Sequence, residues 1–455
     1  MSAGALRLVA LNGLLGYGYP AESLDRALAL EPDLLGVDAG STDPGPYYLG
    51  AGESFVSEEQ AARDLEPGLC AAVARGIPLV VGTAGGSGAA PHLDRAVAMV
   101  RELAARHRLH CRLAVIPAEV PAETVLAALR AGRIVPCGHT RALTEEDVRA
   151  CTRIVGQMST EPLVRALEGG AQVVIAGRCC DAAIFAAEPI HRGFDPGLAL
   201  HLGKIMECGA LCARPAGAND VLVGTIGADS FTVEPANPAR RCTPESVAAH
   251  SLYEQPDPHR FHEPEGTVDL SACAFEALGE RAVRVRGSRL IAAAEPTVKL
   301  EGARCRGYRT ITIAGVRDPG IIAHLGEIEA AVRAGVTGAL PGDLPADELS
   351  LRFLRYGLDA VTEAPEGPPP VPPREVGLVI EAIAPTQELA DRALALARAT
   401  ALHQHFDGRK TTAGNLAFPF SPSDLRGGPV YEFAVYHLLR GADPAALFPV
   451  AFEEV

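Results

Sequence analysis

The sequence has no excess of positive charge. Its 41 lysine and arginine residues stand against 56 aspartate and glutamate residues, which leaves a formal net charge of −15. This sign is wrong for neutralising a phosphate backbone or an anionic lipid surface. We therefore expect neither nucleic acid nor a membrane as a partner. An anionic small substrate would need a local site of backbone N–H groups and a few arginines.

Long apolar runs, a targeting leader and a disulfide framework are also missing. No uncharged apolar run approaches the ~20 residues that span a bilayer. The apolar start, residues 8–15, has no basic leader and no small-residue cleavage site. The 11 cysteines are an odd number with no regular framework and no zinc-ligand spacing, as expected for reduced thiols. These absences predict a soluble cytoplasmic protein with no metal site.

Apolar residues, in contrast, make up 48% of the 455 residues, and charged residues make up 21%. This composition predicts a globular chain of two or three domains. In the first half, short Leu- and Val-rich runs alternate with longer Ala-rich segments. That pattern predicts an α/β fold with a mostly parallel sheet and helices on both faces. Beyond about residue 218, alternating strands predict a second, mixed α+β domain.

The expected organisation has four parts. Residues 1–217 form a Gly-loop-rich α/β domain and residues 218–363 a mixed β-rich domain, followed by a Pro-rich linker at 364–374 and a C-terminal αβ segment at 375–455 that packs on the preceding domains. The predicted strands of the first part are residues 7–11, 34–38, 77–81, 112–116, 133–136 and 173–176. Its predicted helices are residues 21–30, 58–74, 93–107, 122–129 and 161–167.

Four Gly-rich loops follow predicted strands, at residues 12–18, 38–50, 82–88 and 177–181. Ligands of open α/β sheets bind beyond the carboxyl ends of the strands, so we expect these loops to gather at one edge. The loop at 82–88 has no Gly-Lys-Ser/Thr ending, and Pro91 stands where a dinucleotide fingerprint needs its third glycine. The sequence has no signature for ATP, NAD or PLP.

The same loops carry candidate site residues, each with an ordinary structural alternative. Asp38 and Asp43 could act as a base or hold a substrate hydroxyl, or they could be turn residues. The sequence around Gly85, Gly86 and Ser87 differs by one residue from a nucleophile-elbow motif, in which Ser87 would be the nucleophile. The alternative is a structural glycine turn. Arg178 and Asp181 could face an anion or cap a helix. Thiols at that helix start could be activated, or they could be inert buried residues.

Two histidine-containing segments complete the candidates. His201, Lys204 and Cys208 recur at helical spacing and could share a face, where His with Cys would form a nucleophile and base pair. A solvated polar face is the alternative. His403 and His405 invite a metal hypothesis. However, residues two apart on a helix point in different directions, and histidines at a helix end also complement its dipole.

Five stretches together resemble the acyclic terpene utilisation AtuA family. They are DAGSTDPGPY (38–47), VIAGRCCD (174–181), HLGKIMECG (201–209), VKLEG (298–302) and TTAGNLAFPF (411–420). The resemblance spans nearly the whole chain. It implies a role in the catabolism of branched acids related to citronellol and geraniol, as coenzyme A thioesters. The step it implies is cleavage or hydration of a 3-hydroxy-3-methylglutaryl-like thioester. Longer relatives carry an extra C-terminal domain, which we expect this chain to lack.

The sequence therefore predicts an enzyme acting on a branched acyl-CoA thioester or related carboxylate, as a lyase, a hydratase or an acyl-transfer or hydrolytic enzyme. Its cofactor is unknown, and coenzyme A could be part of the substrate. One alternative is a metal-dependent lyase, or an amide or ester hydrolase, acting on a free acid. Another is a non-catalytic scaffold or subunit of an acyl-CoA pathway complex. A homo-oligomer is compatible with the apolar content.

The candidate residues fall into two groups. The predicted catalytic residues are Cys208, His201, Asp38 and Asp181, with Cys208 and His201 as the reactive pair. The predicted substrate-binding residues are Asp43, Ser41, Gly85, Gly86, Ser87, Arg178 and Lys204.

Overall fold

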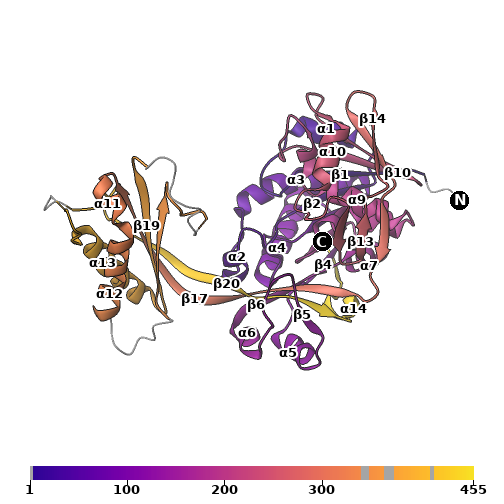
Figure 1. Cartoon of the computed structure of the whole chain (residues 1–455). Helices are drawn as coiled ribbons and strands as arrows, with labels where there is room; N and C mark the ends of the chain where they lie inside the picture. Colours follow the sequence, from indigo (N-terminus) through magenta and orange to yellow (C-terminus); the bar gives the residue numbers. More distant parts are fainter. Residues whose placement is uncertain (1–3, 340–347, 363–372, 410–413) are drawn as a thin grey trace. The chain divides into compact units, whose positions relative to one another are not determined.

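The computed structural model describes residues 4–339, 348–362, 373–409 and 414–455 (Figure 1). The chain forms two compact units. The first runs to Arg304 and includes Phe433–Val455, and the second is Cys305–Glu432. The fold is mixed α/β with a large sheet that contains parallel strands, plus further sheets, which confirms the predicted fold class. Residues 364–372 of the predicted linker lie outside the described residues.

A ten-stranded sheet forms the centre of the first unit. Five parallel strands lie in its middle, in the order β1 (Leu6–Ala10), β2 (Leu34–Asp38), β3 (Leu79–Gly82), β7 (Val173–Ala176) and β4 (Arg112–Ile116). Antiparallel strands extend it at both sides. They are β9 (Leu222–Ile226), β10 (Ser230–Pro235), β15 (Ala282–Arg286) and β14 (Ala274–Leu278) beyond β1, and β21 (Ala451–Glu454) beyond β4.

Helices cover both faces of this sheet, as Figure 1 shows for α3 and α4 on one side of β2 and α9 on the other. Successive strand residues point to opposite faces. Leu8 and Val80 therefore join a core with α7 (Thr160–Glu168), α8 (Asp181–His191) and α9 (Pro196–Met206). Val9 and Val81 join a second core with α1 (Ala21–Leu28), α3 (Glu58–Arg75) and α4 (Ala90–His107). Because both faces are buried, these strands read as continuous apolar runs.

The predicted strands and helices of the first half are all present, with ends shifted by a few residues. The short elements that escaped prediction include α2 (Pro46–Ala51), α6 (Glu145–Ala150) and β6 (Cys151–Gln157). Two of them have only six residues, too few for a helical period to show. The strands β5 (Ile134–Pro136) and β6 join a different sheet from β1.

The chain beyond residue 218 begins by extending the first sheet. Strand β9 pairs antiparallel with β1, with Leu6 opposite Ile226, and β10 pairs with β9. The predicted domain boundary at 217/218 stays a prediction, but the strands on either side of it share one sheet. No helix in the described part of the chain is long and apolar enough to cross a membrane.

The second unit is a smaller antiparallel sheet with helices. The end of the long strand β17 (Thr297–Val316) pairs with β19 (Val376–Ala384), which pairs in turn with β18 (Ser350–Tyr356). Helices α12 (Leu325–Ala339) and α13 (Gln387–His403) contribute most of the other residues of its apolar core. Another long strand, β20 (Asp424–Arg440), also belongs partly to each unit.

Three of the Gly-rich loops pack backbone against backbone at the strand ends. A Cβ on Gly40 would lie 2.2 Å from the carbonyl oxygen of Gly86. One on Gly88, whose φ is +67°, would lie 2.0 Å from the nitrogen of Arg178. The Gly88 carbonyl also accepts a hydrogen bond from that nitrogen, at 3.2 Å. The glycines therefore allow loops from three strands to meet at one edge.

We expect Gly88→Ala to destabilise the protein more than a left-handed backbone alone explains. Gly76 is the matched control because its φ is +66° and nothing lies within 4 Å of an added Cβ. Urea unfolding should show a larger loss for Gly88→Ala than for Gly76→Ala, by about 1–3 kcal/mol from overpacking. Equal losses would contradict the close packing of these loops.

Candidate functional site

A pocket of about 300 Å³ lies where the Gly-rich loops meet, in the first unit. Five of its lining residues carry carboxyl groups: Asp38, Asp43, Asp181, Glu207 and Glu254. Ser41 and Cys208 also line it, together with apolar and aromatic residues that include Phe55 and Tyr253. The expectation that a site lies beyond the carboxyl ends of the parallel strands fits this position.

Asp38 and Asp181 reach this pocket from the ends of two strands, β2 and β7, that both pair with β3. Asp38 is the last residue of β2, and Asp181 is the first residue of α8, directly after β7 and its loop. Burial and the charge of Asp181 raise the pKa of Asp38 well above its usual range. Burial also raises the pKa of Asp181, although the Arg178 and Lys204 charges oppose this. Two carboxyl groups whose charges interact in this way titrate as a pair.

Arg178 is fixed by a buried ion network behind the pocket. Its Nε donates to Oε2 of Glu301 at 2.8 Å, and its Nη1 lies 3.4 Å from Oδ1 of Asp181. Glu301 is fully buried and is also bound by Lys299 Nζ and by the hydroxyl of Thr42, each at 2.8 Å. Burial works to raise the pKa of Glu301, but the charges of Arg178 and Lys299 hold it at about 2. Arg178 therefore positions Asp181 and does not line the pocket.

Lys204 likewise binds side chains of the pocket without lining it. Its Nζ lies 2.5 Å from Oε1 of Glu207 and 3.8 Å from Oε2 of Glu254, and 5.7 Å from the centre of the Tyr253 ring. Lys204 does not line the pocket, whereas both glutamates do. Burial raises the pKa of Glu207 to about 8, against the charge of Lys204. Glu207 therefore holds or releases a proton near neutral pH.

The predicted reactive pair of His201 and Cys208 is not formed. Nδ1 of His201 bonds to the hydroxyl of Ser288 at 2.7 Å, and Nε2 bonds to that of Ser251 at 2.8 Å. Burial lowers the pKa of His201 to about 3, so this histidine is a neutral core residue. Helix α9 ends at Met206, so Cys208 is not on its face. Cys208 lines the pocket, but burial and the charge of Glu207 raise the pKa of its thiol.

The thiols at the start of α8 are not activated either. Burial raises the pKa of Cys179 to about 12. Burial also raises the pKa of Cys180, whose thiol donates to Oε2 of Glu263 at 2.6 Å. Burial also raises the pKa of Glu263, to about 7. At this helix N-terminus the loss of solvent outweighs the favourable dipole.

The predicted residues Ser41 and Asp43 line this carboxyl-rich pocket, called the acidic pocket below, whereas those of the loop at 82–88 do not. Gly85, Gly86 and Ser87 do not line it, and Gly85 lines a separate apolar pocket. Ser87 is fully buried, and its hydroxyl has no hydrogen-bond partner in the described chain. A nucleophile needs a neighbouring base.

The histidines of the metal hypothesis are exposed at the end of α13 in the second unit. His403 is in the last turn of that helix, and His405 follows it. Across the described ranges, no three or more His, Cys, Asp or Glu side chains form a group that could hold a metal ion.

Several site residues were absent from the predicted set, namely Glu207, Glu254, Glu263, Lys299 and Glu301. A signal existed for two of them. Lys299 and Glu301 are two apart on β17, and residues two apart on a strand face the same side. The stretch VKLEG therefore places an ammonium beside a carboxylate. Nothing in the sequence indicates that this pair meets Arg178 of a distant loop.

The fold and the pocket define a class: an α/β protein with a carboxyl-rich site beyond the ends of parallel strands. The family model of the acyclic terpene utilisation family protein AtuA matches residues 54–219 and 229–420. This chain therefore belongs to the AtuA family. No curated protein and no solved structure matches it. Arg178, Asp181, Glu207 and Glu301 lie inside the matched residues, whereas Asp38 lies before them. Residues 411–413 of the stretch 411–420 lie outside the described chain.

We expect Glu301→Gln to lower the free energy of unfolding by about 3 kcal/mol near neutral pH, because it removes the closest anion of the buried Arg178 and the anion of the partly buried Lys299. Glu301 has a depressed pKa, about 2 against an ordinary 4.5, so its contribution is complete above about pH 4.5. That contribution is lost as the pH falls toward 2. Chemical denaturation at several pH values should show the difference from wild type narrowing over that range. Glu276→Gln, at an exposed ion pair with Arg286, is the control and should change little.

Proposed function

We propose that the acidic pocket is the active site of a hydratase or lyase that acts on a branched acyl-CoA thioester by proton transfer. The observation that carries this proposal is the pair of Asp38 and Asp181, two carboxyl groups with raised pKa values in one pocket. A pair of titratable groups with different surroundings is a common source of a general acid and a general base.

The surroundings of the two carboxyl groups suggest their roles. Arg178 lies 3.4 Å from Asp181 and favours its ionised form, so Asp181 is the base. Asp38 is more buried, and the charge of Asp181 raises its pKa further, so Asp38 is the acid. In hydration, Asp181 takes a proton from water as the water oxygen bonds to the β-carbon of an unsaturated thioester. Asp38 gives its proton to the α-carbon, and proton exchange between the two residues restores the starting state.

The charge of the pocket favours a thioester over a free acid. Five carboxyl groups line it, and the nearest cations, Arg178 and Lys204, are already bound to glutamates. A free carboxylate would add another negative charge to this surface, whereas the thioester group is neutral. The membership of the AtuA family, with its link to acyclic terpene utilisation, fits branched acyl groups as the substrate class.

Acyl transfer through Cys208 is a second candidate, because this thiol lines the same pocket. It needs a thiolate, which the raised pKa of Cys208 disfavours. It also needs a base, and both ring nitrogens of His201 are bound to serines.

Binding is tested first with a thermal-shift screen of coenzyme A, branched and 3-hydroxy acyl-CoA thioesters, and the matching free acids. A ligand at about a hundred times its dissociation constant should stabilise the protein by roughly 2.7 kcal/mol. We expect the thioesters to raise the melting temperature more than the matching free acids do. A shift with free acids alone would support the free-acid lyase or hydrolase instead. A flat screen would support the scaffold or subunit.

Turnover of the best thioester tests the roles. We expect Asp181→Asn and Asp38→Asn each to reduce kcat by about 10²-fold or more, because each removes a proton-transfer group. The thioester should still shift the melting temperature of both variants. Asp25→Asn, at an exposed residue of α1, is the matched control. Cys208→Ala separates the two candidates, because loss of turnover in that variant, with full turnover in Asp38→Asn, would establish acyl transfer.

A further inference from the structure

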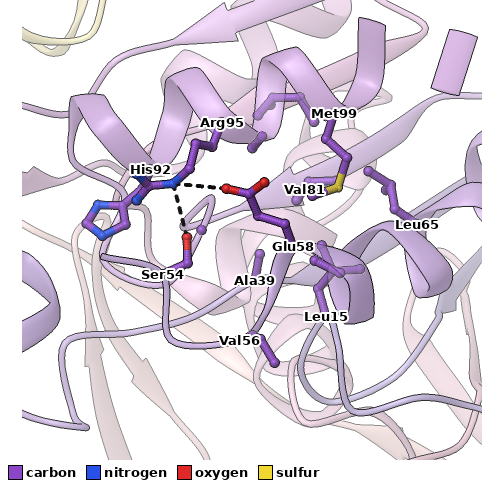
Figure 2. Close-up of a pocket in the computed structure, with 14 residues that line it drawn as sticks. Leu15, Ala39, Ser54, Val56, Glu58, Leu65, Val81, His92, Arg95 and Met99 are labelled. Carbon is purple, nitrogen blue, oxygen red and sulfur yellow. Dashed lines mark hydrogen bonds and ion pairs between the residues drawn. The ribbon is translucent and has the colours of Figure 1, made fainter. Parts of the chain in front are cut away.

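A second pocket lies on the other side of the loops, between the sheet and helices α3 and α4 (Figure 2). Its walls are mostly apolar and include Leu15, Ala39, Leu65, Val81 and Met99. The enclosed space is small, about 30 Å³. A small space with apolar walls offers water few partners, so it favours an apolar occupant.

The lining of this apolar pocket includes one cationic side chain, that of Arg95. In Figure 2, Arg95 of α4 lies between Ser54 and Glu58, with dashed lines to both. Its Nε donates to the hydroxyl of Ser54 at 3.3 Å, and its Nη2 donates to the carbonyl of Gly52. Oε1 of Glu58 is 3.7 Å from Nε, beyond hydrogen-bond distance, and the Glu58 side chain is 66% exposed. Such an exposed ion pair contributes little and is easily exchanged.

The pocket adjoins a charged groove between α3 and α4. Glu58, Arg95 and Met99 line both hollows, and the groove measures about 530 Å³. A ligand can therefore have its apolar end among the strands and its polar end beside Arg95. The acidic pocket shares none of these residues.

We propose that this pocket binds a short-chain alkyl carboxylate. The alkyl chain occupies the space beside Leu65 and Met99, and the carboxylate replaces that of Glu58 on the Arg95 guanidinium. The guanidinium of arginine has five N–H donors, and Ser54 and Gly52 accept from only two of those of Arg95, so the others can donate to a carboxylate. The proposal goes beyond the thioester activity and does not depend on it, because the two sites have different residues.

Isothermal titration calorimetry with butanoate tests the proposal through two substitutions that should change the dissociation constant in opposite directions. Arg95→Gln should weaken binding at least tenfold, because it removes the cation. Glu58→Gln should tighten binding, because it removes the competing carboxylate while leaving Arg95 in place. Glu22→Gln, an exposed glutamate in the first turn of α1, is the matched control and should leave the dissociation constant unchanged.

The length of the ligand's alkyl chain tests whether its apolar end is buried in the pocket. Each methylene buried should strengthen binding by roughly fourfold, so butanoate should bind about sixteenfold more tightly than acetate. Ala61→Leu, which adds volume to the wall formed by α3, should weaken butanoate more than acetate.

Three outcomes would overturn the proposal. They are the absence of saturable butanoate binding to wild type, equal affinity in Arg95→Gln and Glu58→Gln, and loss of binding in Asp181→Asn with retention in Arg95→Gln. The last would place butanoate in the acidic pocket. Because Glu58 is exposed, Glu58→Gln keeps the test valid even where Arg95→Gln fails to fold.

Discussion

The buried carboxylate of Glu301 is the point on which the acidic pocket depends. It binds Thr42 from the loop after β2, Arg178 from the loop after β7, and Lys299 from its own strand β17. A buried charge is expensive unless every partner is in place. Here three donors, two of them cations, surround one carboxylate, so three distant segments are held in one arrangement. Asp181 takes its position from this network through Arg178.

Burial decides which side chains of the site can carry chemistry. Loss of solvent raises the pKa of thiols and carboxyl groups alike. For Cys179 it raises the pKa to about 12, away from neutrality, so a thiolate is disfavoured. For Glu207 and Glu263 it raises the pKa values to about 8 and about 7, so these carboxyl groups exchange protons near neutral pH. Burial thus disfavours nucleophilic catalysis by the thiols and favours acid–base catalysis by the carboxyl groups.

The sequence predicts the strands, the principal helices of the first half and the edge where the loops meet, because these follow from local periodicity and from glycine placement. It does not predict the partners of His201, since Ser251 and Ser288 come from segments far along the chain. The helical spacing of His201 and Cys208 was misleading because α9 ends at Met206. Glu301 was missed for a similar reason, because its importance comes from contacts across the fold. Local sequence patterns predict where helices and strands run, whereas the protonation state and the role of a side chain depend on tertiary contacts.

The two pockets are connected through the backbone that separates them. Ala39 lines the apolar pocket, whereas its neighbours Asp38 and Gly40 line the acidic one. Leu14 and Leu15, in the turn after β1, likewise line the acidic and the apolar pocket respectively. The apolar walls beneath Asp38 therefore exclude water from its far side. That exclusion contributes to the desolvation that raises the pKa of Asp38, so apolar packing behind the loops helps to keep this carboxyl group protonated.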